Sequence, residues 1–182
     1  MDGTLTIPIH DFQEIRTRLG IPKTRDILGY INEQEESERC RLLQRLEVWE
    51  HEIAQRAQPS LDALELLGVL REKGHRCAVL TRNTRDFAIV TLNAAQLIDF
   101  FEPEVILGRD CATPKPSPAG IHKILAYWNA KPEDTVMIGD DINDVLAGNN
   151  AGCSSVFIER NRPLANPGIA DILCRNLKAL IF

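Results

Sequence analysis

The stretch that decides the fold is TVMIGDDINDV at residues 135–145. Its first part, Thr135–Ile138, is a short apolar run that predicts a buried strand, and the glycine after it permits a tight turn. Two aspartates follow, Asp140 and Asp141, and a third, Asp144, lies where the next helix is predicted to begin. A strand that leads into a helix in this way is typical of a parallel α/β sheet, in which ligands bind at the carboxyl ends of the strands.

The same alternation of apolar runs and amphipathic segments continues on both sides of this stretch. Ser60 is suited to cap the helix that follows it, and Gly74 to end that helix. The pattern predicts an α/β domain with a Rossmann-like parallel sheet and helices on both faces. The predicted strands are 77–80, 104–107, 135–138, 155–158 and 170–173, and the predicted helices are 60–73, 84–95, 117–128 and 141–150, with a short helix at the end of the chain.

Residues 9–59 differ from the rest of the chain and predict a small α-helical insert. This segment is rich in arginine, glutamate, glutamine and leucine, and its apolar residues recur at steps of three and four. The division predicts a core domain of residues 1–8 and 60–182, with residues 9–59 as a helical cap. The predicted helices of the insert are Ile9–Leu19, Arg25–Tyr30 and Glu33–Arg56.

Composition narrows the class of protein. The chain has 182 residues, of which 44% are hydrophobic and 26% charged, and its net charge is −5. The acidic balance, with no cluster of lysine and arginine, argues against a nucleic-acid partner. No apolar run reaches the roughly 18–20 residues that span a bilayer, which argues against a membrane partner. The five cysteines are scattered without CxxC spacing, which predicts reduced thiols in a cytoplasmic protein, with neither a zinc site nor a disulfide framework.

Four short segments concentrate polar side chains, three of them directly after predicted strands. Together they supply carboxylates, a lysine and a hydroxyl, which the topology would gather at one sheet edge. Carboxylates suit a hard cation such as Mg²⁺, and a lysine beside them suits a phosphate group. We therefore predict a magnesium-dependent phosphate site. The four segments are Met1–Thr6, Thr81–Asn83, Thr113–Pro118 and Gly139–Asp144.

The order of these segments resembles that of the haloacid dehalogenase-like hydrolase superfamily. The motifs that carry the resemblance are DGT at 2–4, TRN at 81–83, KPSP at 115–118 and GDDIND at 139–144. The chain is most similar to the phosphoglycolate-phosphatase-like branch, which has a helical cap between the first and second motifs. The resemblance implies an enzyme that hydrolyses a phosphate monoester of a small phosphorylated metabolite, with Mg²⁺ as cofactor.

The resemblance also implies a role for individual residues. Asp2 matches the general acid/base, whose backbone carbonyl also contacts the metal, and Lys115 matches the lysine that balances charge on nucleophile and phosphate. Thr81 matches the hydroxyl that binds the transferring phosphoryl group, and Asp140 matches a direct Mg²⁺ ligand. The remaining matched positions are Gly3 and Thr4 in the turn after the acid, Arg82 and Asn83 beside the phosphate, and Asp141 and Asp144 in or beside the metal shell.

One departure from the family pattern concerns the nucleophile. The pattern reads Asp-x-Asp-Gly-Thr, and here Met1 stands at the x position with nothing before it. The aspartate nucleophile and the central apolar strand that delivers it are therefore not in this sequence. Two explanations are open: Met1 is an internal methionine of a longer chain, which is our expectation, or the protein is a defective or regulatory relative. The chain as written is expected to show no turnover through an aspartyl-phosphate.

Other functions remain open at this stage. One is a non-catalytic member that binds Mg²⁺ and a phosphorylated ligand or a partner. A second is hydrolytic dehalogenation of a small halo-acid, which needs no metal, so that Asp2 and the acidic cluster of Asp140 to Asp144 argue against it. A third is phosphomutase activity, which the small cap and the lack of a sugar signature disfavour.

Each candidate residue also has an ordinary structural interpretation. Lys115, between prolines, is compatible with a solvated loop, and Thr81 with a hydroxyl that caps the following helix. The aspartates at 140, 141 and 144 are compatible with acids in the first turn of a helix, where the helix dipole favours them. Arg82 is compatible with plain surface charge, as are the arginines of the insert, Arg16, Arg18 and Arg25.

Overall fold

A computed structural model describes residues 1–8, 12–160 and 163–181 of the protein, and its core contains two parallel sheets. One sheet has two strands in the order β1-β2, and the other has three in the order β3-β4-β5. Because all pairings are parallel, the carboxyl ends of the strands within each sheet lie at the same edge. The strands are β1 (Val79–Leu80), β2 (Ile106–Leu107), β3 (Val136–Gly139), β4 (Ser154–Ile158) and β5 (Ile172–Cys174).

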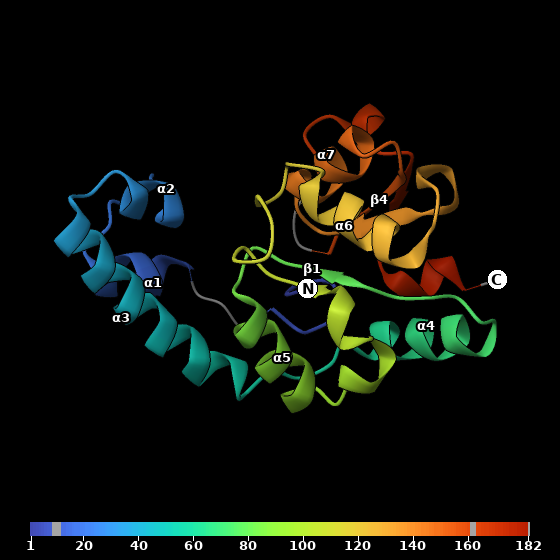
Figure 1. Ribbon diagram of the computed structural model, residues 1–182, viewed down its shortest axis with the longest axis horizontal. Helices are drawn as coiled ribbons and strands as arrows, with labels where there is room; N and C mark the ends of the chain where they lie inside the picture. Colours follow the sequence, from blue (N-terminus) through green and yellow to red (C-terminus); the bar gives the residue numbers. More distant parts are fainter. Residues whose placement is uncertain (9–11, 161–162, 182) are drawn as a thin grey trace.

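Helices cover both faces of the sheets. On one face, α4, α5 and the 3₁₀ helix η5 pack on the strands, and on the other face α6 and α7 do so (Figure 1). The strands alternate accordingly: Val156 packs with α4, whereas the next residue, Phe157, packs with α7. The predicted α/β fold with helices on both faces is confirmed. These helices are α4 (Leu61–Glu72), α5 (Arg85–Ala94), α6 (Ala119–Trp128), α7 (Ile142–Asn150) and η5 (Leu177–Leu180).

Element boundaries differ from the prediction where proline or turn chemistry intervenes. The predicted strand 104–107 begins as a 3₁₀ helix, Pro103–Val105, because proline starts a helical turn readily and cannot donate to a strand ladder. The terminal helix is the short 3₁₀ helix η5. Gly74 ends α4 with φ +75°, as predicted. Ser60 is the N-cap residue of α4, but its hydroxyl contacts the carboxylate of Asp62 and not the helix backbone. The remaining 3₁₀ helices are Ile98–Phe100, Pro132–Asp134 and Pro167–Ile169.

A cavity of about 870 Å³ separates the two sheets. Residues of β1 and β3 line it, so that it runs between the facing edges of the two sheets. Side chains from both helical layers complete the lining, among them Leu66 of α4 and Ile124 of α6, and Met1 lies in the wall as well. Among the described residues, no strand pairs with both sheets across this cavity.

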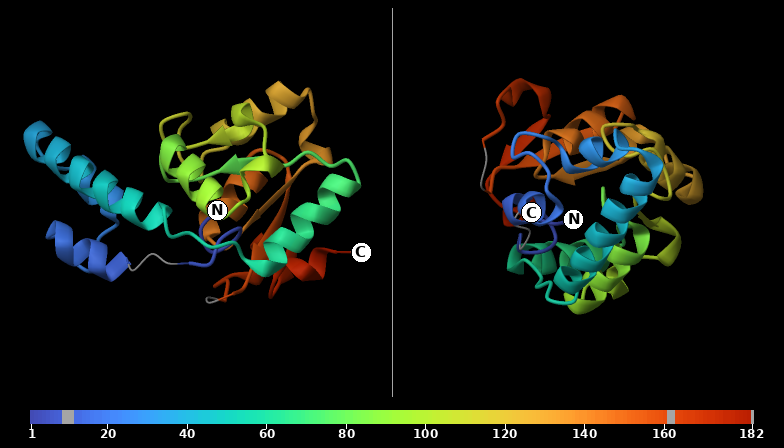
Figure 2. Two further views of the ribbon diagram at one scale, coloured as in Figure 1. Left: turned by 90° about the horizontal axis from the view of Figure 1, so that it is seen from below. Right: turned by 90° about the vertical axis from the view of Figure 1, so that its left-hand side faces the viewer.

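Three further helices form a separate group at one side of the core (Figures 1 and 2). They are α1 (Phe12–Leu19), α2 (Ile27–Asn32) and α3 (Glu36–Ala54). The group has its own apolar cluster, in which Ile31 and Leu42 are almost fully buried. The three predicted helices of the insert are therefore present, although residues 9–11 at the start of the first lie outside the described part.

Among residues 1–8, 12–160 and 163–181, no helix is both long and apolar enough to cross a membrane. The five cysteines are free thiols. Burial raises the pKa of Cys77, Cys153 and Cys174, which disfavours the reactive thiolate form at these positions.

Candidate functional site

The turn at Asp2–Thr6 lies against the loop after β3. Gly3 has φ +77°, and a Cβ atom there would stand 2.2 Å from Oδ2 of Asp140. The hydroxyl of Thr4, which is buried, donates to Oδ1 of the same aspartate at 2.6 Å. The turn closes on itself because the backbone N–H groups of Thr4, Leu5 and Thr6 donate to the carbonyl of Met1. Glycine is thus required at position 3 by backbone conformation and by the approach of a carboxylate.

Asp2 is joined to the loop after β1. The side-chain amide of Asn83 donates to Oδ2 of Asp2 at 2.8 Å, and the hydroxyl of Thr6 contacts Oδ1 at 3.3 Å. Thr81, which is buried, accepts a hydrogen bond from the backbone N–H of Asn83 at 3.2 Å. The structure therefore brings the predicted acid/base and the predicted phosphate-binding loop together.

Lys115 is buried, with a side chain that is 6% exposed, so that the solvated-loop interpretation is wrong. Its ammonium donates to the carbonyl of Leu80 at the end of β1 at 2.7 Å and forms an ion pair with Asp144 of α7, which is equally buried. An added Cβ at Gly139 would stand 2.1 Å from Oδ2 of Asp144, so glycine at that position makes room for the carboxylate. Lys115 thus joins the end of β1 to the start of α7.

The three aspartates after β3 have different roles in the structure. Asp141 caps α7, since its side chain accepts from the backbone N–H of Asn143 at 2.9 Å. Asp144 completes a capping box by accepting from the N–H of Asp141 at 3.1 Å, in addition to its pair with Lys115. The helix N-terminus interpretation therefore accounts for both. It does not account for Asp140, whose carboxylate lies before the helix against the Gly3–Thr4 turn.

Asp140 is the carboxylate of this site that is placed to act as a metal ligand. No group of three or more His, Cys, Asp or Glu side chains is placed to hold a metal ion among the residues that the structure describes. Magnesium keeps several waters and usually takes only one or two carboxylates, together with phosphate oxygens. Asp140 offers one such carboxylate, and its oxygens lie against the turn at Gly3 and Thr4 that follows Asp2.

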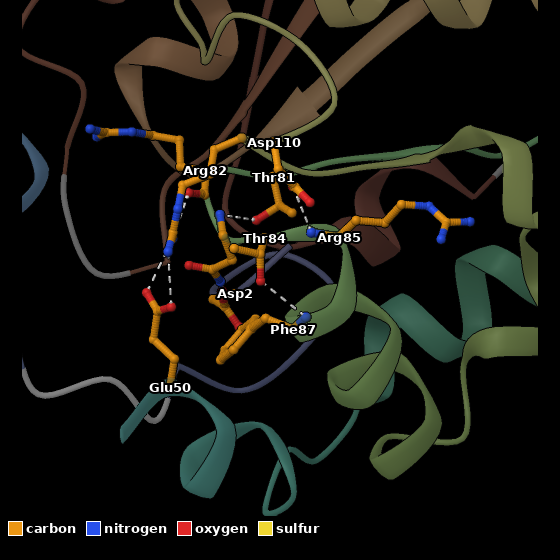
Figure 3. A network of polar contacts seen from close by, with 10 residues as sticks. Asp2, Glu50, Thr81, Arg82, Thr84, Arg85, Phe87 and Asp110 are labelled. Atoms are coloured by element: carbon orange, nitrogen blue, oxygen red, sulfur yellow. Dashed lines mark hydrogen bonds and ion pairs between the residues drawn. The ribbon is translucent and has the colours of Figure 1, made fainter. Parts of the chain in front are cut away.

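Two arginines in or beside the predicted phosphate-binding loop bind acids of the helical group. Arg82 lies with its guanidinium 3.5 Å from Asp26, at the start of α2. Arg109, which the sequence did not single out, forms a bidentate contact with Glu50 of α3 and donates to the carbonyl of Arg82 at 3.2 Å (Figure 3). Arg109 lies outside every motif in the sequence, so only the three-dimensional structure shows its place at the site.

A second pair that the sequence did not predict, Asp62–Arg160, also contacts the Asp2–Thr6 turn. Arg160, just after β4, binds both carboxylate oxygens of Asp62 at 2.6 and 2.8 Å and contacts the carbonyl of Thr4 at 3.3 Å. Burial by itself would raise the pKa of Asp62. Hydrogen bonds from Arg160, from Ser60 and from the backbone N–H of Leu177, together with the Arg160 charge, outweigh burial and lower that pKa below its ordinary value.

Several solved structures share the fold of this chain. The chain superposes on a hydrolase from Pseudomonas syringae with a TM-score of 0.79 at 21% identity, covering 98% of this chain and 92% of the other. A HAD hydrolase of family IA, variant 3, from Entamoeba histolytica gives a TM-score of 0.83 at 16% identity, with the same coverage of 98% and 92%. At these identities the likeness concerns the fold, which is that of HAD-type hydrolases.

Sequence comparison identifies the family. The sequence model of the haloacid dehalogenase-like hydrolases matches residues 6–158, so the chain belongs to that family, as the motifs predicted. Among curated relatives, a pyrophosphatase named PpaX from Halalkalibacterium halodurans is 33% identical over 101 residues, which cover 56% of this chain and 46% of that protein. PpaX of Anoxybacillus flavithermus is 37% identical over 89 residues, which cover 49% of this chain and 41% of that protein. The matches therefore span less than half the length of these relatives.

Proposed function

We propose that the protein provides the catalytic framework of a magnesium-dependent phosphatase that acts on a small phosphorylated metabolite. The carrying observation is that hydrogen bonds and one ion pair tie all four predicted segments together. Asp2 contacts Asn83, Thr4 contacts Asp140, and Lys115 joins the end of β1 to Asp144. The names of the relatives support this class, since PpaX is called a pyrophosphatase and a structural neighbour from Haemophilus somnus a predicted phosphoglycolate phosphatase (TM-score 0.70, 22% identity, 81% of this chain and 67% of that one).

Asp2 is the proposed general acid/base. In its protonated form it gives its proton to the alcohol oxygen as the phosphoryl group passes to a carboxylate before Met1, and as a carboxylate it then takes a proton from the water that hydrolyses the resulting aspartyl-phosphate. Asn83 holds the Asp2 carboxylate in place through Nδ2, and the hydroxyl of Thr81 is proposed to donate to the phosphoryl oxygens. Lys115 is proposed to offset negative charge at the reacting carboxylate and phosphate, which is the usual function of a lysine in such a site.

Asp140 and the carbonyl of Asp2 are proposed to hold Mg²⁺. When bound, the ion neutralises charge on the phosphoryl oxygens. Thr4 fixes one oxygen of Asp140, and the other oxygen faces Gly3. Asp144 is proposed to act at the edge of the metal shell, through its pair with Lys115, and Asp141 through its cap of α7.

The mechanism requires a carboxylate directly before Met1. The cavity between β1 and β3 supports this proposal, because it has apolar walls from both helical layers and Met1 lies in its wall. A short apolar strand in that cavity would merge the two sheets and end beside Lys115, which also lines the cavity. Residues 9–59 are proposed as a cap over this site, which excludes water and selects the substrate.

The test is to extend the chain at its N-terminus by four apolar residues and an aspartate and to assay hydrolysis of p-nitrophenyl phosphate. We expect turnover that depends on Mg²⁺ and is abolished when a chelator removes the ion. The matched control has asparagine in place of the added aspartate and should be inactive. In the active chain, Asp2→Asn should lower kcat by about 10²–10⁴-fold.

The same experiment distinguishes phosphatase activity from the alternative functions. If the extended chain stays inactive but binds Mg²⁺ and inorganic phosphate in a way that Asp140→Asn weakens, then the protein is a binding member of the family and the phosphatase proposal is wrong. Metal-independent release of halide from a small halo-acid would instead favour dehalogenation.

A further inference from the structure

We infer that Arg109 is a positioning residue that couples the seating of the cap helix α3 to the orientation of Asn83 and, through it, of Asp2. The inference rests on the proposed function only for the role of Asp2. Its observations are a largely buried ion pair between α3 and the core, hydrogen bonds from Arg109 to the carbonyls of Arg82 and Asn83, and a hydrogen bond from the Asn83 side chain to the Asp2 carboxylate (Figure 3).

The backbone of Arg109 is held firmly in the core. Its N–H donates to the carbonyl of Asn83 at 2.8 Å. The residue before it, Gly108, packs so closely on the start of α5 that an added Cβ would stand 2.2 Å from the backbone nitrogen of Arg85. Asp110, the residue after Arg109, accepts a hydrogen bond from the backbone N–H of Arg85 at 2.8 Å. The loop therefore presents the Arg109 side chain from a fixed position.

The side chain of Arg109 reaches both the cap and the phosphate-binding loop. Its two terminal nitrogens lie 3.3 Å from the two carboxylate oxygens of Glu50, and one of them also donates to the carbonyl of Arg82. Only 12% of the Arg109 side chain and 9% of the Glu50 side chain are exposed. A buried charge that loses its partner is costly, so movement of α3 away from the core is opposed by the need to keep this pair intact.

The loop that Arg109 supports carries the contact to Asp2. Asn83 offers its backbone carbonyl to the N–H of Arg109, its own N–H to Thr81 and its side-chain amide to Asp2. When the guanidinium holds the carbonyl of Arg82 and the Arg109 N–H holds that of Asn83, the loop has little freedom to rotate. Seating of α3 thus fixes the direction from which Asn83 meets the carboxylate.

The first experiment uses the chain as it stands and compares two charge-removing variants. Glu50→Gln removes the buried partner of Arg109, whereas Asp26→Asn removes the exposed partner of Arg82 and serves as the matched control. NMR would follow exchange of the Asn83 side-chain amide protons with water. We expect Glu50→Gln to accelerate that exchange at least about tenfold and Asp26→Asn to change it less than about twofold. Equal rates in Glu50→Gln and the unchanged protein would overturn the inference.

Turnover separates positioning from plain stabilisation. In the extended, active chain, Glu50→Gln should lower kcat per folded molecule by about 10–100-fold with KM within about twofold, because misorientation acts on the transition state. Arg109→Ala should have the same effect and Arg109→Lys should recover part of it. A loss of thermal stability with unchanged kcat and unchanged Asn83 signals would mean that the pair is only structural. An Asn83 response without any phosphatase activity would support the coupling and contradict the proposed function.

Discussion

The charged side chains of the core site and those on the surface of helices α1–α3, the proposed helical cap, have contrasting environments. In the core, Lys115 and Asp144 are each 6% exposed and come from positions 29 residues apart. In the cap, Arg18 and Glu14 are 59% and 46% exposed and lie one helical turn apart. Exposed pairs contribute little because water and salt screen them, whereas a buried pair persists only if both partners are held in place by the surrounding fold. The buried charged side chains are therefore the ones whose positions the surrounding fold fixes.

The arginines of the proposed cap that the sequence singled out have their partners within the cap itself. Arg18 and Arg25 pair with glutamates of the cap itself, and Arg16 donates to the carbonyl of Arg25. These contacts agree with the interpretation of solvated helix faces. The one pair that combines burial with a link from cap to core is Glu50–Arg109, as far as the described residues go.

The largest expected effect comes from the buried core pair. Lys115→Ala leaves the carboxylate of Asp144 buried without its cation, and we expect the free energy of unfolding to fall by about 3–5 kcal/mol. Urea unfolding measures it. The double variant Lys115→Ala with Asp144→Ala should recover part of the loss, because no unpaired charge remains. A loss below about 1 kcal/mol would mean that the pair is solvated and that burial does not separate core from cap.

A smaller effect is expected at the glycine of the first turn. Gly3→Ala should cost about 2–4 kcal/mol, since the left-handed backbone costs about 1–2 kcal/mol and the new Cβ would also displace Asp140. Gly20 in the segment after α1 is the control: it has φ +72°, and apart from its chain neighbours no atom of the described residues lies within 4 Å of an added Cβ, so Gly20→Ala should show the backbone cost alone. Urea unfolding measures the free energy of unfolding of both variants. Equal losses would show that the contact with Asp140 adds nothing to the backbone cost.

The Asp62–Arg160 pair should give an effect that depends on pH. Because the pKa of Asp62 is lowered in the folded state, its carboxylate contributes stability above the unfolded pKa, and that stability is lost as pH falls through the folded pKa. Asp62→Asn should therefore cost about 1–2 kcal/mol near pH 7 and progressively less below about pH 4. Urea midpoints at several pH values test this, and a difference that stays constant from neutral to acidic pH would contradict it.

The smallest effect is expected in the cap. Arg18→Ala removes an exposed pair on α1 and should change the free energy of unfolding by only about 0.3–0.5 kcal/mol, with a further decrease in high salt. Thermal unfolding with and without added salt is sufficient. A loss comparable to that of Lys115→Ala would remove the distinction between the two regions.

Much of the fold was accessible from the sequence because its signals are local. Apolar runs, a glycine at the end of α4 and the amphipathic spacing of α3 follow from neighbouring residues, and each predicted helix of the core is present, the terminal one as the 3₁₀ helix η5. The strand predicted at 104–107 is only partly correct, since proline at 103 makes its start helical. The sequence predicted one parallel sheet. The division into two sheets depends on which distant segments pair in space, and only the structure shows that pairing.

The candidate site shows the same division. Motif order was enough to select Asp2, Thr81, Lys115 and Asp140, because the carboxyl ends of parallel strands must lie together. It was not enough to find Arg109, which belongs to no motif and acquires its position from a loop, a helix of the cap and a backbone carbonyl.

The sequence by itself determined the family, the alternation of strands and helices and the identity of the chemical groups, because each of these depends on residue type and spacing. Tertiary structure decided which acids serve a helix end and which face the turn at Gly3, and it decided that Lys115 is buried. It also decided which cap acid reaches the core. The physical reason is that burial and pairing of charge depend on desolvation and on distance in space, and neither is encoded in the separation of residues along the chain.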